Sequence, residues 1–383
     1  MEVFGNASIM LFIFAVVAVI INGTPQFIYT EARGFAIKPA GFAFLIGAIG
    51  NIITGSVTPL SGQAMTITIA SMKKDLRNNV SAILVASIIM MVLSALGGVT
   101  WIVNFAGPAV IAGMMSGGGL ILAGVAHEMY GQDKRTAVVS IVAAVIAYAL
   151  FIDSQNRVVW VIFVSVVVAS ADFLFFQKRR VDVTSSIDPE RQSMRMSNEW
   201  RFWKKSYWSE FKFIRPAINV TVILSALSIV MLNIGSNISF GAINASIAGT
   251  TQHFDHLAFI NAVADIPSAV FGGPPIEPII SGTAGAPWPV AAGIVFMIIM
   301  GVLLLLGMVG RLGKYLPAQS ITGFLLVLGF AFIFAPNLTS VSSSEHPMSG
   351  YMALGITAWS KNMFYGIAAG VAIRYFGALV GLG

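Results

Sequence analysis

The chain has 383 residues, of which 57% are hydrophobic and only 10% are charged, and its mean hydropathy is +0.84. Soluble domains carry about 25% charged residues, so this composition indicates a polytopic membrane protein. The chain has no cysteine, which excludes disulfides and thiolate metal sites. The four histidines form no HxxxH or HExxH motif and no Walker-type glycine loop occurs, so we expect no ATPase, no metalloenzyme and no cofactor.

Seven apolar segments are predicted before a polar linker. They span residues 8–28, 37–55, 57–71, 77–97, 105–124, 135–152 and 157–177. A helix needs about 20 residues to cross the bilayer core, so the third segment is too short for an ordinary span. Its single proline and single glycine, Pro59 and Gly62, also interrupt a helix. No removable signal peptide is expected at the start, where the first segment is predicted to begin insertion.

The linker at 178–213 differs from the rest of the chain in being strongly basic. Its second half places aromatic residues at helical spacing between lysines and arginines: Trp200, Trp203, Tyr207, Trp208 and Phe211. This pattern is typical of an interfacial helix that lies against anionic lipid. Because the linker adjoins a membrane span, we favour the lipid bilayer as its partner and expect no nucleic-acid binding.

Seven further segments follow at 214–235, 255–271, 275–287, 288–310, 317–335, 347–359 and 361–381. An internal repeat supports this division, because residues 88–113 resemble residues 298–323 and each copy follows a short broken segment. With seven segments between the copies, the second copy must lie inverted. The predicted fold is therefore an all-α polytopic membrane protein of two inverted seven-segment repeats, 1–177 and 214–383, with short broken third and tenth segments.

The tenth segment lies in VFGGPPIEPIISGTAGAPWP, residues 270–289, which combines prolines, glycines and one glutamate between long apolar runs. Non-helical backbone at membrane depth survives only where it is buried in protein or lines a cavity. We expect a half-helix after 275 that points its positive N-terminal end at a polar or anionic solute. The alternative is that glycine and proline are simply common in membrane helices.

Several stretches resemble the nucleobase–cation symporters of the nucleobase–ascorbate transporter superfamily, nearest the adenine–guanine, xanthine and uracil permeases. They are SVTPLSGQAMTITIA, WIVNFAGPAVIAGMMSGGGLILAG, LNIGSNISFGAINAS, VFGGPPIEPIISGTAG and GRLGKYLPAQSITGFLLVLG. The resemblance implies a core domain of segments 1–4 and 8–11 and a gate domain of segments 5–7 and 12–14. It also implies nucleobase transport coupled to H⁺ or Na⁺ and a homodimer formed through the gate.

The resemblance places the solute between the third, eighth and tenth segments. The implied binding residues are Gln63, Ala64, Leu232, Asn233, Ile280 and Ser281. Leu232 and Ser281 stand where that family has carboxylates, so both acids are missing here. Other polar groups lie near these positions, namely Asn22, Ser236 and Asn237.

Two acids in apolar surroundings are candidates for proton coupling, Glu277 and Asp265, because ionisable groups inside a membrane are functional candidates by default. Glu277 could instead cap its own half-helix by accepting amide hydrogen bonds. Asp265 is interpreted as a structural tether and Asp172 as a residue near the interface. The polar stretch TTQHFDH, residues 250–256, is interpreted as an exposed loop, with a proton relay as the alternative.

Charge asymmetry predicts the orientation. Twenty of the 22 Lys/Arg follow odd-numbered segments, the exceptions being Arg157 and Arg374. The positive-inside rule then places these loops in the cytoplasm and both termini outside, whereas the resemblance implies termini inside. The expected location is the cell membrane, plasma or inner.

Two functions remain open at this point. One is a secondary transporter of a small polar solute. The other is a non-transporting membrane subunit or scaffold, part of a larger complex, that has kept the fold and lost the site; the missing carboxylates favour it. No enzymatic activity is expected, because no nucleophile–base set is visible.

Overall fold

The computed structural model describes residues 2–63, 66–67, 70, 75–154, 157–177, 211, 213–309 and 317–377. The elements up to 177 are mostly long helices. In chain order they are α1 (Glu2–Ala32), α2 (Ala40–Thr54), strand β1 (Leu60–Ser61), α4 (Leu76–Ala95), α5 (Gly98–Gln132), α6 (Lys134–Leu150), α7 (Arg157–Asp172) and the π-helix η1 (Phe173–Gln177). The predicted interfacial helix with Trp200, Trp203, Tyr207 and Trp208 lies outside the described residues.

The elements from 220 onward are again mostly helical. They are α10 (Val220–Ala248), α11 (Phe254–Val270), strand β2 (Glu277–Pro278), the 3-10 helix η2 (Gly282–Gly285), α12 (Pro289–Leu305), the 3-10 helix η3 (Ala318–Ile321), α14 (Thr322–Val327), the π-helix η4 (Leu328–Phe334), α15 (Ala335–Ser342), α16 (Pro347–Ser360) and α17 (Met363–Phe376). The inverted fourteen-segment repeat and its boundaries stay predictions.

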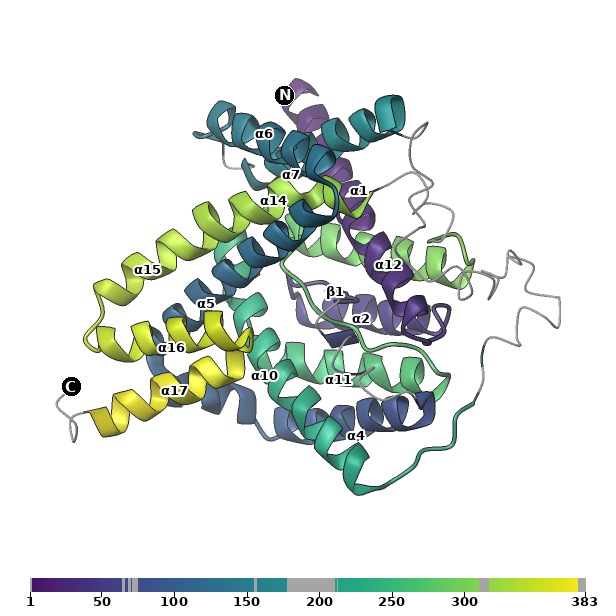
Figure 1. Ribbon diagram of the computed structural model, residues 1–383, viewed down its shortest axis with the longest axis vertical. Coiled ribbons are helices and arrows are strands. Elements are labelled where there is room, and N and C mark those ends of the chain that lie inside the picture. Colours follow the sequence, from purple (N-terminus) through teal and green to yellow (C-terminus); the bar gives the residue numbers. More distant parts are fainter. Residues whose placement is uncertain are drawn as a thin grey trace.

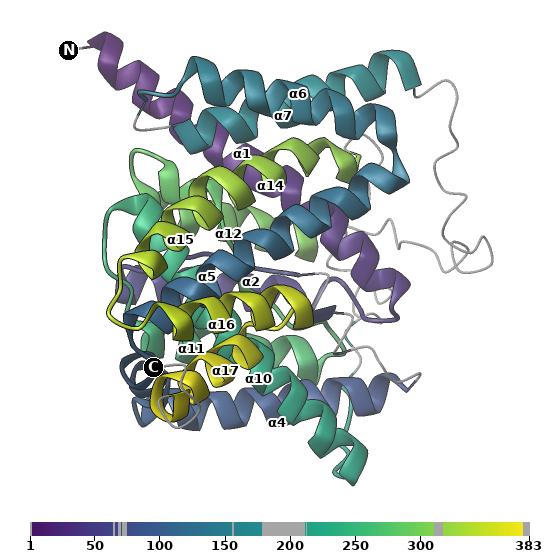
Figure 2. The ribbon, with the colours of Figure 1, turned by 60° about the vertical axis from the view of Figure 1, so that its left-hand side comes forward.

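The helices pack in two neighbouring groups. Helices α5, α16 and α17 contact one another, and α5 also packs on α14, η4 and α15. Helix α2 packs on α11 and α12, while α4 packs on α10 and α11. In Figure 1, α5, α15, α16 and α17 lie together on the left, and α2, α11 and α12 lie on the right with β1 beside them. In Figure 2, α6 and α7 lie at the top and α4 at the bottom.

Five helices are long and apolar enough to cross a membrane: Leu76–Ala95, Gly98–Gln132, Arg157–Phe176, Val220–Ala248 and Gln319–Ser342. Large apolar side chains also face outward along the helices, such as Leu96 at 80% and Trp359 at 83% exposure. Outward apolar surface on this scale suits lipid rather than water. The chain is an integral multi-pass membrane protein.

One predicted segment begins later in the structure than expected. The segment expected at 214–235 forms a helix only from Val220, because residues 213–218 have no helical structure and the Asn219 side chain caps the helix by accepting from Val222 N at 2.9 Å. The segment expected at 105–124 lies within α5, which consists of two helical parts that meet at a break at Gly107, directly before Pro108.

Helix α5 is bent at Gly107, whose φ of 77° and ψ of 167° are not helical. Pro108 has no N–H to donate to the Asn104 carbonyl, and the break at Gly107 leaves the carbonyls of Phe105 and Ala106 without helical partners. Arg374 of α17 replaces them, because its Nη1 donates to the carbonyls of Phe105 at 3.2 Å and Ala106 at 2.7 Å. The bend is therefore stabilised from a helix more than 260 residues away in sequence.

Gly107→Ala is expected to destabilise the protein by about 2–4 kcal/mol. Alanine is strained at this φ, and its Cβ would overlap the Arg374 guanidinium and displace it from the two carbonyls. The matched control is Gly124→Ala in the same helix, where a Cβ meets nothing within 4 Å. That change should be neutral or stabilising by up to about 1 kcal/mol. Equal melting temperatures for the two variants in detergent would contradict this account.

Candidate functional site

The candidate site lies where two interrupted segments pair with each other. Strand β1 pairs antiparallel with β2, with Leu60 opposite Pro278 and Ser61 opposite Glu277. Ile279 N also donates to the Pro59 carbonyl at 3.1 Å. Directly paired residues place their side chains on the same face of the two strands, so Ser61 and Glu277 lie side by side. Two short extended segments thus meet inside a helical membrane protein.

The tenth segment is not the predicted half-helix, and this expectation is wrong. Residues 274–281 are extended or irregular, and only the four-residue η2 follows before α12. The cause lies in the sequence, because Pro274, Pro275 and Pro278 donate no backbone hydrogen bond and disfavour helix in the residues before them. The predicted helix dipole aimed at the solute is therefore missing from this segment.

Side chains from α10 and α11 replace the helical hydrogen bonds that this buried backbone lacks. Asn261 Nδ2 donates to the Ile276 carbonyl at 2.6 Å, and Asp265 Oδ1 accepts from Ile276 N at 2.7 Å. Ser268 Oγ donates to the Pro274 carbonyl at 2.7 Å. Buried backbone groups without partners are costly, so these side chains make the extended path possible at membrane depth.

Asn244 performs the same task at the other end of the strand. Its Nδ2 donates to the Ile279 carbonyl at 2.7 Å, and its Oδ1 accepts from Ser281 N at 3.0 Å. From the opposite segment, Gln63 Nε2 donates to the Pro278 carbonyl at 2.9 Å. The extended path from 274 to 281 is thus held by polar side chains of three different elements.

A second set of buried polar atoms has no hydrogen-bond partner among the described residues. It lies around the strand pair and comprises Ser61 Oγ, Asn233 Oδ1, Asn237 Oδ1 and Glu277 Oε1. The hydroxyls of Thr66 and Ser236 lie beside the Glu277 carboxyl, and Asp265 is close enough to interact with it electrostatically. Unsatisfied buried polar groups require an explanation, and a bound solute or ion is one.

The unpartnered atoms have a common chemistry. The two Asn oxygens and the Glu277 oxygen can accept hydrogen bonds or contact a cation, and the Ser61 hydroxyl can do either. Neither Glu277 nor Asp265 forms an ion pair with another described residue. No group of three or more His, Asp or Glu that could hold a metal ion occurs in the described part of the chain. The site is therefore rich in oxygen acceptors and carries two buried carboxyls.

Most of the predicted binding residues lie around this strand pair. Asn233 is buried and leaves its amide oxygen unpartnered, Gln63 supports Pro278, and Leu232 and Ile280 are buried apolar residues. Ser281 has a structural contact, because its Oγ accepts from Thr283 N at 3.2 Å and caps η2. Ala64 lies outside the described residues. That these residues bind a solute stays a prediction.

The two candidate acids differ in their contacts. Glu277 is 1% exposed and lies on β2, so the interpretation that it caps a half-helix is wrong. Asp265 is equally buried and does support structure, through Ile276 N. Asn244 and Asn261, by contrast, were not among the predicted site residues. The buried asparagines of α10 share one face of the helix, at Asn233, Asn237 and Asn244, and that spacing is the signal by which Asn244 could have been found.

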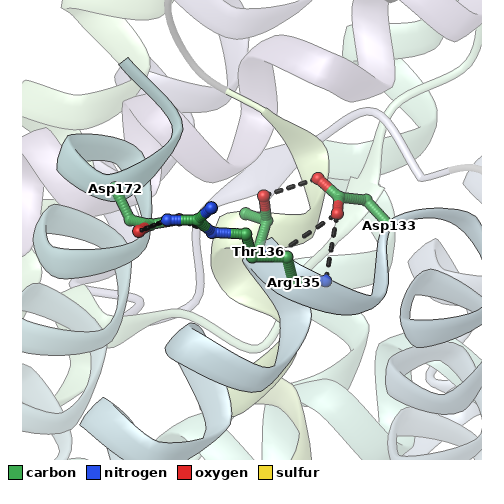
Figure 3. Close-up of polar contacts among 4 residues, drawn as sticks. All are labelled: Asp133, Arg135, Thr136 and Asp172. Atoms are coloured by element: carbon green, nitrogen blue, oxygen red, sulfur yellow. Dashed lines mark hydrogen bonds and ion pairs between the residues drawn. The ribbon is translucent and has the colours of Figure 1, made fainter. Parts of the chain in front are cut away.

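Asp172, the third acid considered from the sequence, lies away from the site at the end of α7. It forms a two-point ion pair with Arg135, whose Nη2 is 2.8 Å from Asp172 Oδ1 and whose Nε is 3.1 Å from Oδ2 (Figure 3). Asp133 caps the same end of α6 by accepting from Arg135 N and Thr136 N. This cluster joins α6 to α7.

No protein-family model matches the chain, and no curated protein matches it in sequence. Solved structures do match. The transmembrane domain of the cyanobacterial bicarbonate transporter BicA aligns with a TM-score of 0.55 at 13% identity, over 95% of this chain and 97% of that one. SLC26A9 aligns with a TM-score of 0.54 at 14% identity, over 98% of this chain and 66% of that one. The chain has the fold of these transporters.

This finding corrects the resemblance drawn from the sequence. The structural neighbours are anion transporters, a different family from the nucleobase–cation symporters, although the two families share a fold type. Short apolar motifs with glycine and proline are set largely by that fold type, so they did not separate the families. Leu232 and Ser281 consequently no longer count as positions that have lost a carboxylate.

Proposed function

We propose that the chain is a secondary transporter that moves a small anionic solute together with H⁺ or Na⁺ through the site around Glu277. The observation that carries the proposal is the set of unpartnered oxygen atoms gathered where β1 and β2 cross. BicA, one of the structural neighbours, is a bicarbonate transporter, and this supplies the class of solute. The transport role is supported by the fold that the chain shares with them.

The coupling to a cation follows from charge. The described part of the site holds two carboxyls, Glu277 and Asp265, and neither is in an ion pair there. An anion that enters beside an ionised carboxylate meets a like charge in a medium of low dielectric, which is strongly unfavourable. A proton or Na⁺ on the Glu277 side removes that repulsion. We therefore expect solute and cation to bind together.

The test is uptake by the full chain in liposomes. A panel of labelled small anions that includes bicarbonate is offered under a pH gradient or a Na⁺ gradient, one at a time. We expect uptake of at least one anion above that of protein-free liposomes, driven by only one of the two gradients. Thermal stabilisation by the same anion, dependent on the same cation, should accompany it.

No uptake and no stabilisation across the panel would contradict the proposal. That result would favour the alternative of a non-transporting membrane subunit that keeps the fold. This alternative was first supported by the absence of the acids expected at Leu232 and Ser281. Because the structural neighbours belong to a different family, that absence no longer supports it. The proposal includes no enzymatic activity, and a homodimer through the gate domain of segments 5–7 and 12–14 is proposed with it.

A further inference from the structure

The stretch from the end of α10 into the first turn of α11 makes polar contacts with two regions far away in sequence. Gln252 Oε1 accepts from Ser56 Oγ at 3.3 Å and from Thr58 Oγ1 at 3.1 Å. Three residues later, the Asp255 carboxylate accepts from Val99 N at 2.9 Å and Thr100 N at 3.2 Å. The loop interpretation of 250–256 is thus correct only up to His253, because Phe254 begins α11; His253 and His256 are exposed as expected.

The Gln252 contact reaches the segment that leads into the site. Thr58 is two residues before β1, and its carbonyl also accepts from Asn51 Nδ2 at 3.0 Å. Pro59, the next residue, accepts from Ile279 N of the opposite segment. A displacement of residues 56–58 therefore also displaces the β1–β2 pair. The two are separated by few rotatable bonds and are joined by a continuous set of hydrogen bonds.

The Asp255 contact reaches the other group of helices. Val99 and Thr100 are in the first turn of α5, whose amides have no partner within the helix. Gly97 precedes that turn with a φ of 75° and provides no side-chain cap. A carboxylate from α11 takes the place of the missing cap, and its negative charge suits the positive end of the helix dipole. The same part of α5, before the break at Gly107, contacts α17, because Arg374 donates to the carbonyls of Phe105 and Ala106.

We propose that Gln252 and Asp255 act as a tie between the strand pair and α5, and that this tie helps to set how the two groups of helices stand relative to each other. In a transporter, the relative position of the two groups of helices decides from which side of the membrane the solute reaches the site. The proposal therefore rests on the proposed function. Gln252 and Asp255 are positioning residues here, since neither contacts the unpartnered atoms of the site.

The tie predicts a change in arrangement and not only in stability. Both of its contacts arise from residues three positions apart, so the strand pair cannot move relative to α5 without breaking one of them. Loss of two charge-assisted hydrogen bonds corresponds to a shift of about tenfold or more in a two-state equilibrium. We expect Asp255→Ala to raise the population of a second arrangement by about that factor.

The measurement is a distance distribution between spin labels on the two groups of helices. Cysteines replace Ile49 of α2 and Trp359 of α16, both well exposed, and the chain has no other cysteine to take the label. Asp133→Ala is the matched control, because Asp133 makes the same kind of cap on α6 but within its own helix. It should lower stability as a lost cap does and leave the distances unchanged.

Asp255→Ala should add or enlarge a second distance, and Gln252→Ala should change the distribution in the same direction. If Asp255→Ala fails to fold, Asp255→Asn, which keeps one acceptor oxygen, should show a smaller shift. Distances equal to those of the parent in the folded Asp255 and Gln252 variants would overturn the tie. The distances are measured in an experiment that involves no transport. A chain that moves no solute would therefore contradict the proposed function, whereas the distance test of the tie would still apply.

Discussion

Glu277→Gln should reduce cation-driven uptake about tenfold or more while the protein stays folded. The change keeps the shape of the side chain and removes the group that can exchange a proton or hold a sodium ion. Hydrogen bonds and ion contacts to a charged group contribute about 1.5–3 kcal/mol, which corresponds to at least roughly tenfold in binding. Exchange of solute without net movement of the cation should persist, because the remaining oxygens of the site are unchanged.

Glu277→Ala separates two roles of the same carboxyl. If the carboxyl also contacts the solute, the alanine variant should lose exchange as well as driven uptake. The matched control is Glu128→Gln, where the glutamate is 61% exposed and pairs with Lys361 at 3.0 Å. The control should transport like the parent. Driven uptake by Glu277→Gln at the parent's rate would exclude Glu277 as the coupling group.

The existence of the break at the tenth segment could be predicted from sequence, but not its form. Pro274, Pro275 and Pro278 exclude a continuous helix by local stereochemistry, and local stereochemistry is visible in the sequence. What replaces the helix depends on Asn244 and Asn261, which lie on other elements. Nothing in the prolines shows which remote side chains hold the strand, so the expected half-helix was wrong while the expected interruption was right.

Helix α5 shows the same division. The Gly107–Pro108 pair suggested the start of a separate segment, and the helix is indeed broken at Gly107, whose backbone is not helical. The sequence does not show that Arg374 donates to the carbonyls of Phe105 and Ala106, which the break leaves without helical partners. Arg374 was notable in the sequence only as one of two cations outside the predicted cytoplasmic loops. Its role needs the packing of α17 on α5, which no local pattern indicates.

Among the site residues, Glu277 could be selected because a carboxyl in an apolar sequence is rare and costly. Its neighbours Ser61 and Thr66 could not, since serine and threonine are ordinary in membrane helices and only the pairing of β1 with β2 brings them to the carboxyl. The family was misassigned for a related reason. Glycine and proline motifs record the backbone path that two families share, whereas the solute is selected by a few side chains.

The largest loss of stability is expected from Asn244→Leu. Asn244 is fully buried and bonds both the Ile279 carbonyl and Ser281 N, which have no helical partner because the strand is extended. Leucine is similar in size but offers neither donor nor acceptor. Each buried group left unpaired costs about 1–3 kcal/mol, so the variant should lose about 2–6 kcal/mol.

Asn337→Leu is the matched control for this change. Asn337 Nδ2 donates to the Ile333 carbonyl, but Asn337 lies on a helix and is only partly buried. When the amide is removed, water or a backbone hydrogen bond of the helix can satisfy the Ile333 carbonyl. Its cost should stay below about 1 kcal/mol. The comparison is made by melting temperature in detergent and by unfolding in mixed micelles. If Asn244→Leu has the same melting temperature as the parent, the extended path does not depend on this asparagine. The account of how side chains stabilise extended backbone at membrane depth would then be wrong.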